Sequence, residues 1–220
     1  MDLDRLAAGA HHDPHSILGA HPGPEGVTIR ALRPLAEKVE AIVDGTAHEL
    51  RHVAHGVFEV TIPGLDKIPD YRLRITYPGA PPYETDDPYR HLPTLGEFDL
   101  HLIHEGRHER LWEVLGARVM RHEDVDGTAF TVWAPNARGV RVIGDFNHWD
   151  GTACPMRSLG RSGVWELFLP GVGPGARYKF QVLGIDGVWR EKADPMARRT
   201  EVPPATASIV ERSAYEWRDA

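Results

Sequence analysis

The chain has 220 residues, of which 41% are hydrophobic, and this length suits two domains of about 100 residues better than one. Its formal net charge of -7 disfavours binding to nucleic acids or to anionic membrane surfaces and fits a neutral ligand. Cys154 is the only cysteine, and the sequence shows neither a signal-peptide pattern nor a run of about eighteen apolar residues, so we expect a cytoplasmic protein without disulfides.

The first predicted element is a short helix near the amino terminus. Asp13 is a good helix cap and Pro14 suits a first helical turn, so we expect His15 to Leu18 to be helical and to end at Gly19. Apolar runs separated by Gly, Pro and Asp turns follow, and they are typical of short β-strands. The first strand-rich region therefore begins soon after this helix.

A second helical pattern separates two strand-rich regions. Leu111, Val114 and Leu115 fall on one face of a helix over Glu109 to Leu115, which stops at Gly116. A connector with an apolar face leaves less freedom than a Gly/Ser linker. We therefore expect this helix to wedge the two domains together into one rigid arm.

The second strand-rich region contains six predicted strands. They are Phe130 to Trp133, Val140 to Ile143, Val164 to Leu169, Tyr178 to Leu183, Val188 to Glu191 and Ala207 to Val210. Six or seven short strands at this spacing predict an antiparallel β-sandwich of immunoglobulin type. Trp133 and Trp165 lie inside apolar runs, so both are expected in the core.

An internal repeat indicates that the two regions share one fold. Gly26 to Pro34 aligns with Gly127 to Pro135 at an offset of 101 residues, and Gly56 to Glu59 aligns with Gly163 to Glu166 at an offset of 107. The change of offset places six extra residues in the second copy, in the interval that holds Phe146 to Gly151. The sequence thus predicts an all-β protein with two tandem immunoglobulin-like antiparallel β-sandwiches and short helices at the N-terminus and in the connector.

The extra segment carries the main candidate site, a large aromatic residue in a polar turn. Trp149 either folds back onto the sheet or presents its ring outside, where the apolar face of a sugar can pack on an indole. Trp189 is a second candidate, and Asn147, Lys179 and Gln181 have side chains that can bind sugar hydroxyls. The first copy lacks this set. The alternative is that both tryptophans are core or domain-contact residues, and sequence patterns alone leave it open.

Other chemistry has less support in the sequence. Several histidines cluster without a cysteine or a compact carboxylate set, so no metal site is expected at His11, His12, His15 and His21 or at His101, His104 and His108. Hydrolysis of a glycosidic bond needs two carboxylates at a defined separation, and no spacing marks such a pair. We expect no catalytic residues and no cofactor in this chain.

Over nearly its whole length, the chain resembles the amino-terminal region of bacterial glycogen branching enzyme, a 1,4-α-glucan branching enzyme of glycoside hydrolase family 13. His12 to His15 with Leu18 to Pro22 resemble the opening of its first accessory domain, and Gly106 to Ala117 resembles its connector. Phe130 to Ala137 and Gly144 to Gly151 resemble carbohydrate-binding module family 48.

The resemblance implies a domain organisation. Residues 1–100 form the first accessory β-sandwich, 101–120 a helical connector, 121–211 the family 48 β-sandwich and 212–220 the start of a missing catalytic barrel. Tyr215, Trp217 and Asp219 resemble the first residues that lead into that barrel. The catalytic residues of the family then lie beyond Ala220, and this chain alone is not expected to be an enzyme.

The resemblance also implies roles for the candidate residues. By motif, the glucan contacts of related modules fall on Trp149, Lys179 and Trp189, with Asn147 in the same turn. We therefore expect the chain to bind or position α-1,4-glucan (glycogen or a maltooligosaccharide) for a barrel that transfers α-1,4-glucan segments into α-1,6 branches during glycogen biosynthesis. The alternative is a structural or interaction module that stabilises the barrel or an oligomer without a glucan site.

Overall fold

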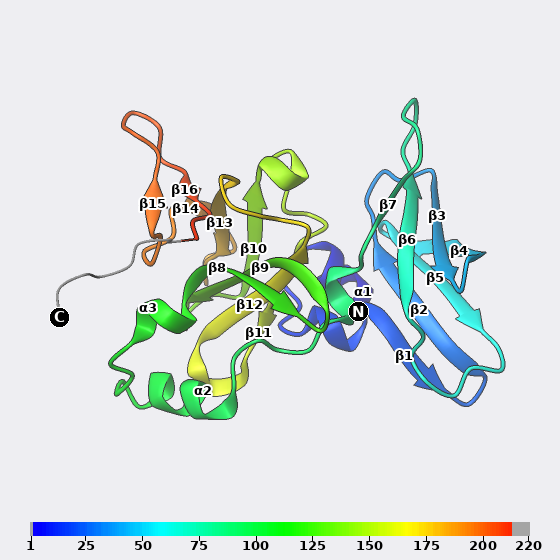
Figure 1. The fold of residues 1–220 in the computed structure, drawn as a ribbon, viewed down its shortest axis with the longest axis horizontal. Helices are drawn as coiled ribbons and strands as arrows, with labels where there is room; N and C mark the ends of the chain where they lie inside the picture. Colours follow the sequence, from blue (N-terminus) through cyan, green and yellow to red (C-terminus); the bar gives the residue numbers. More distant parts are fainter. Residues whose placement is uncertain (1, 213–220) are drawn as a thin grey trace.

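Antiparallel strands account for most of the regular secondary structure in this computed structural model, which describes residues 2–212 (Figure 1). They form two β-sandwiches that lie side by side, the first built from the amino-terminal part of the chain. The expected fold class, all-β with two tandem immunoglobulin-like sandwiches and short helices, is confirmed. Tyr215, Trp217 and Asp219 lie outside the described residues. Within those residues, no helix combines the length and apolar character that spanning a membrane requires.

The first sandwich contains seven strands in the spatial order β1-β2-β5-β4-β3-β6-β7. They are β1 (Gly19–Gly23), β2 (Gly26–Leu32), β3 (Lys38–Val43), β4 (Thr46–Ala54), β5 (Val57–Ile62), β6 (Tyr71–Thr76) and β7 (Tyr83–Thr85). The first half of β4 pairs with β3 and the second half pairs with β5, so this strand passes from one sheet to the other. Alternate residues of β3 and β6 are buried between the sheets, as period-two patterning requires.

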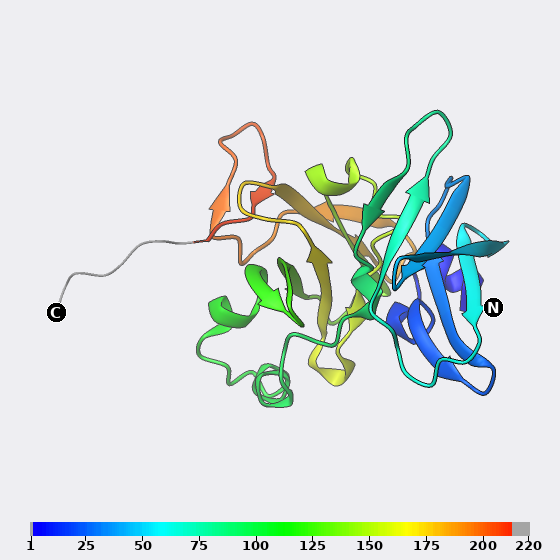
Figure 2. The ribbon, with the colours of Figure 1, turned by 45° about the vertical axis from the view of Figure 1, so that its right-hand side comes forward.

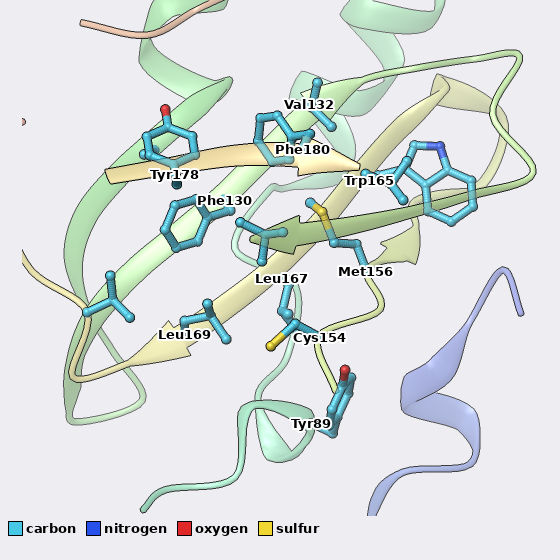
Figure 3. Packing of buried hydrophobic residues seen from close by; sticks show 14 of the residues in the cluster. Tyr89, Phe130, Val132, Cys154, Met156, Trp165, Leu167, Leu169, Tyr178 and Phe180 are labelled. Atoms are coloured by element: carbon cyan, nitrogen blue, oxygen red, sulfur yellow. The ribbon is translucent and has the colours of Figure 1, made fainter. Parts of the chain in front are cut away.

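The second sandwich contains a four-stranded sheet in the order β11-β12-β9-β8 and a five-stranded sheet in the order β10-β13-β16-β15, with β14 on β13. The strands are β8 (Gly116–His122), β9 (Val125–Trp133), β10 (Gly139–Gly144), β11 (Arg157–Ser158), β12 (Val164–Pro170), β13 (Arg177–Leu183), β14 (Trp189–Lys192), β15 (Arg199–Thr200) and β16 (Ser208–Ile209). Figure 3 shows Phe130, Leu167 and Phe180 packed between strands of the two sheets.

Trp133, which was predicted to lie in the core, lies on the outer face of its sheet. Phe130 and Val132 of β9 point into the core, so Trp133 points to the opposite side and is 55% exposed. Its indole N–H donates to the Ser162 carbonyl. Trp165, by contrast, is buried in the core as expected.

The short helices differ in extent from the predictions. The predicted helix at 15–18 is a single 3-10 turn, η1 (Pro14–Ser16), and the connector helix is reduced to α3 (Leu111–Val114). Two helices were not predicted, α1 (Asp2–Ala7) and α2 (Glu97–His104). Three further 3-10 turns complete the fold, η2 (Pro88–Arg90), η3 (Asp145–Asn147) and η4 (Gly160–Ser162).

The connector helices do not separate the two sandwiches, so the prediction that they wedge the domains together was wrong. Leu111 and Val114 pack against an apolar cluster of Leu95, Ile103, Leu115 and Val164. This cluster belongs to the second sandwich and its flank, and both views place α2 and α3 away from the first sandwich (Figure 2). The apolar face of α3 therefore packs against the second sandwich and its flank.

Amino-terminal residues join the sandwiches instead. Leu6 and Leu18 are fully buried in the same cluster as Phe130 of the second core, and Leu32 and Val57 of the first sandwich belong to it as well. Apolar packing is thus continuous from one sandwich to the other. Polar contacts support it, since the hydroxyl of Tyr89 in η2 donates to the carbonyls of Ala153 and Pro155.

Candidate functional site

Strand register gathers candidate residues on the outer face of the five-stranded sheet. Tyr178 and Phe180 of β13 point into the core, so Lys179 and Gln181 point outward. Gln181 lies opposite Arg141 of β10 and opposite Glu191 of β14. Leu183 lies opposite Trp189, which places this indole two positions from Glu191 on the same face. Residues far apart in sequence therefore share one surface.

Trp189 is held by a cation–π contact. The guanidinium carbon of Arg141 lies 4.4 Å from the centroid of the indole ring. Arg141 also donates from Nη2 to the carbonyl of Ala7, so the end of α1 borders this face. Burial lowers the pKa of Arg141 from its usual value. One side of the Trp189 ring is therefore fixed by the protein, and the partly exposed residue can offer its remaining surface to a ligand.

Lys179 has free donor capacity on the same face. Its Nζ lies 3.8 Å from Oε2 of the exposed Glu191, which is too far for a hydrogen bond. The ammonium group can therefore donate to hydroxyl oxygens while the carboxylate accepts from hydroxyl protons. This pair supplies polar partners beside an aromatic ring.

The turn after β10 positions Trp149. His148 and Trp149 both adopt positive φ angles, 53° and 63°. The indole N–H of Trp149 donates to Oδ1 of Asp145 at 3.3 Å, and hydrogen bonds from Arg177 lower the pKa of this aspartate. Trp149 is partly exposed, so its ring lies at the surface of the turn rather than in the interior.

The side chain of Asn147 bonds to the backbone of its own turn. Its Oδ1 accepts from the backbone N–H of Gly144, and its Nδ2 donates to the carbonyl of Val142, both at 2.9 Å. The amide thus closes the turn in the manner of a cap. Asn147 fixes the geometry in which Trp149 is displayed, and its polar atoms are largely engaged by the backbone.

The same turn folds back over the outer face of the sheet. A Cβ atom added to Gly151 would lie 2.9 Å from Cβ of Arg141 and 3.2 Å from Oε1 of Gln181. Gly151 is therefore required for this close approach. Through Gly151, the turn that carries Trp149 therefore packs against the sheet face that carries Lys179 and Trp189.

Sequence reasoning missed the role of Arg141. A signal was available, because Val140 and Val142 are apolar and strand alternation places the residue between them on the outer face. The partner of Arg141 could not be read from the sequence, since Trp189 reaches it only through pairing across β13.

The single cysteine does not supply a nucleophile to this surface. Cys154 is buried, and burial raises the pKa of its thiol, so the reactive thiolate is disfavoured. Among residues 2–212 no group of three His, Cys, Asp or Glu side chains is placed to hold a metal ion. The arrangement of rings, an ammonium group and a carboxylate is suited to binding a neutral polyhydroxylated ligand.

Two family models match the chain. Residues 1–89 match the N-terminal domain of the alpha-1,4-glucan branching enzyme GlgB, and residues 114–197 match carbohydrate-binding module 48, the isoamylase N-terminal domain. The second match contains the whole candidate surface.

Full-length relatives extend well beyond this chain. The 1,4-alpha-glucan branching enzyme GlgB of Thermobifida fusca is 64% identical over 99% of the chain, and GlgB 2 of Streptomyces coelicolor is 62% identical over 100% of it. The chain spans 30% and 29% of their lengths. A crystal structure of pullulanase type I from Bacillus subtilis complexed with maltose covers 92% of the chain, which spans 28% of that protein, at 16% identity and a TM-score of 0.40, a likeness too distant to support a functional inference.

Proposed function

The chain corresponds to the amino-terminal region of bacterial 1,4-alpha-glucan branching enzymes and contains a carbohydrate-binding module 48, and from this premise we propose that it binds α-1,4-glucan and positions it for a catalytic barrel. The branching reaction is proposed for the whole enzyme and not for this chain by itself. The role proposed for the present chain is non-catalytic and cytoplasmic, within glycogen biosynthesis.

One observation carries the proposal, which is that the turn of Trp149 packs against the sheet face that carries Lys179 and Trp189. We refer to these three residues as the platform. Indole rings accept the C–H face of a glucose unit, while Lys179 and the neighbouring Glu191 offer a donor and an acceptor to its hydroxyls. Such a surface selects a neutral sugar chain by shape and hydrogen bonding. It holds the chain without changing any bond.

Affinity for a short glucan is expected to be modest. The platform is an outer sheet face with an adjoining turn, so a bound sugar keeps much of its surface in water. The sugar also loses torsional freedom and part of its hydration when it binds. A weak site of this kind suits a polymer that must be held and then released, and the many chain ends of a branched glucan raise the effective concentration.

A titration with maltoheptaose followed by tryptophan fluorescence tests the proposal. We expect saturable binding by the parent chain and a loss of roughly tenfold in affinity for Trp149→Ala and for Trp189→Ala, because each removes a stacking surface. Trp112→Ala is the matched control, since Trp112 is 56% exposed on α3 and lies outside the platform. A parent chain that gives a flat titration, or platform variants that bind like the control, would contradict a glucan site here.

A second candidate function is supported by a separate surface feature. Phe98 on α2 is 73% exposed and Trp112 on α3 is 56% exposed, and exposed aromatic residues of this size favour contact with another protein surface. In this alternative, the chain stabilises the barrel or an oligomer and has no glucan site. Phe98→Ala should then weaken association with a separately expressed barrel, whereas maltoheptaose should have no effect on the isolated chain.

A further inference from the structure

A cleft of about 850 Å³ lies between the two sandwiches. Its first wall comes from the first sandwich and includes Leu35, Tyr77 and Tyr83. The opposite wall includes His148 and Asp150 of the turn after β10, together with the segment from Leu169 to Val172. The volume lies within the range of roughly 300 to 1,000 Å³ that is usual for small-molecule sites. None of the strand residues of the platform lines this cleft.

The two walls are fixed relative to each other by packing at the base. Tyr89 is buried and bonds to the carbonyls of Ala153 and Pro155, next to the cleft residue Cys154. Tyr89, Cys154 and Leu169 belong to the apolar cluster that also contains Leu32 and Val57 of the first sandwich, and Figure 3 shows the first three together. The cleft is therefore a formed feature of the fold.

The first wall presents aromatic and apolar surface. Tyr83 is 47% exposed and stacks against Tyr77, with ring centroids 6.4 Å apart and planes inclined by 13°. In the repeat alignment, Gly184 and Arg190 occupy the corresponding positions of the second sandwich. The tyrosine pair is thus specific to the first copy. Two rings in nearly the same orientation form an extended surface for successive sugar units.

Leu35 adds a strained apolar residue to this wall. It is 86% exposed and has a φ of 65°, a conformation that costs free energy for a side chain of this kind. The turn closed by the Ala36 N–H and the Arg33 carbonyl accounts for the positive φ, but it does not require a large apolar side chain at this position. A ligand that covers the side chain would supply a reason for one.

Both walls supply hydrogen-bond acceptors. Asp150 is exposed, and hydrogen bonds from Thr152 lower the pKa of its carboxyl group. Asp86, on the first wall, also lines the cleft and lies 4.0 Å from Arg72, and the lining residue Arg33 adds a positive charge beside the two carboxylates. The carboxylates accept hydrogen bonds from hydroxyl groups, and the mixed charges of the lining favour a neutral polar ligand over a strongly charged one.

We propose that this cleft binds a segment of a neutral α-glucan, as a second site besides the platform. The ligand class rests on the proposed function, and the site itself rests on the Tyr77–Tyr83 stack, the exposed Leu35 and the facing carboxylates. The turn after β10 borders both sites, because Trp149 belongs to the platform while His148 and Asp150 line the cleft. A glucan chain longer than the platform then continues into the cleft.

Amide chemical-shift perturbation in NMR spectra of the full chain tests the proposal, with maltoheptaose as the probe. Amides of Tyr83 and Thr152 report on the cleft, and those of Lys179 and Trp189 report on the platform. We expect saturable shifts at both sets in the parent. In Trp189→Ala the cleft shifts should persist, and in Tyr83→Ala they should require a roughly tenfold higher sugar concentration.

Two further variants separate binding from folding. Leu35→Asn replaces the strained residue with one that tolerates a positive φ, so stability should be retained or raised while cleft binding weakens. Phe98→Ala, on α2 and outside both sites, should bind like the parent. Weaker cleft binding in Leu35→Asn without a loss of stability excludes a merely structural role for this residue.

The outcomes distinguish the two proposals. Shifts at the platform without shifts at the cleft would overturn the cleft site and leave the proposed function intact. Shifts at the cleft alone would support the cleft and contradict the platform. Equal shifts of the cleft amides with cellohexaose, which has β-linkages, would overturn the specificity for an α-glucan, and the absence of any shift would overturn both sites.

Discussion

His15, near the junction of the two sandwiches, is a residue whose protonated form is disfavoured by its surroundings. Although part of the residue is exposed, both ring nitrogens are buried and have no hydrogen-bond partner among the described residues. The ring packs edge-on against Tyr89, with centroids 5.0 Å apart. Burial is the largest cause that lowers the pKa of His15 to about 2, and Arg157 adds to it. The histidine therefore contributes to packing in its neutral form.

The lowered pKa predicts that acid destabilises the fold through His15. Below a pH of about 6.5 the unfolded chain takes up a proton at this residue while the folded chain does not, so stability falls as the pH decreases. Between pH 7 and pH 5 this contribution amounts to about 2 kcal/mol. His15→Phe keeps an aromatic ring and cannot titrate, so its free energy of unfolding should decrease less over this interval. Urea titrations of both proteins at the two pH values measure the difference, and parallel decreases would contradict the assignment.

At the scale of elements, the two copies of the repeat share a tertiary interaction, a hydrogen bond from a buried tyrosine to an aspartate. The Tyr71 hydroxyl donates to Asp87 at 2.6 Å, and the Tyr178 hydroxyl donates to Asp194 at 2.5 Å. In each copy the aspartate lies 16 residues after the tyrosine and its other oxygen accepts a backbone N–H two positions further on. The pair fixes the last part of each copy to β6 or β13.

The equivalence also includes an edge strand that the sequence comparison did not find. Gly19 and Gly116 begin β1 and β8, and each has a φ of 89°. They belong to two Leu-Gly-Ala segments, at 18–20 and 115–117, whose offset of 97 residues differs from the offsets of 101 and 107 residues in the rest of the repeat. A second change of spacing concealed the signal, although the three residues are identical.

The tyrosine–aspartate pairs predict matched losses of stability. Tyr71→Phe and Tyr178→Phe each remove one hydroxyl from a buried carboxylate, so each should lower the free energy of unfolding by about 1–3 kcal/mol. Tyr83→Phe is the control, because Tyr83 is exposed and its ring stack is retained. Denaturant unfolding measures all three. A neutral effect at either buried position would show that the pair there does not stabilise the fold.

At the scale of the whole molecule, the two sandwiches share one apolar cluster. It extends from Leu32 and Val57 of the first sandwich through Leu6 and Leu18 to the second core. Buried charge supports the same junction, since Glu166 accepts from Arg157 and from Thr94, a residue of the segment that leads out of the first sandwich. Relative motion of the sandwiches would expose these groups to water or leave them unpaired.

This shared cluster predicts one cooperative thermal transition for the parent chain. Tyr89→Ala removes a buried ring and both of its hydrogen bonds at the junction, so we expect a loss of about 3–5 kcal/mol and separate unfolding of the two sandwiches. Differential scanning calorimetry resolves the transitions. Tyr83→Ala, at an exposed position, should keep the single transition, and two resolved transitions in the parent would be inconsistent with a shared core.

The local patterns of the sequence determined the strands, the duplication and the candidate aromatic residues. Period-two alternation depends only on neighbours along the chain, which is why the six expected strands of the second copy correspond to β9, β10, β12, β13, β14 and β16. Trp149 stood out for the same reason, as an aromatic residue in a polar turn. The domain limits and the sugar-binding roles of the platform residues stay predictions until they are measured.

The tertiary structure decided which residues meet. Pairing of β10, β13 and β14 brought Arg141 against Trp189, backbone bonding turned Asn147 toward its own turn, and α3 packed on the second sandwich rather than between the two. The cleft has no sequence signature, because its walls come from residues within 33–88 and 146–172 that meet only when the domains dock. Which distant segments meet depends on how the two copies bury their apolar surfaces against each other, and no local pattern of residues specifies this packing.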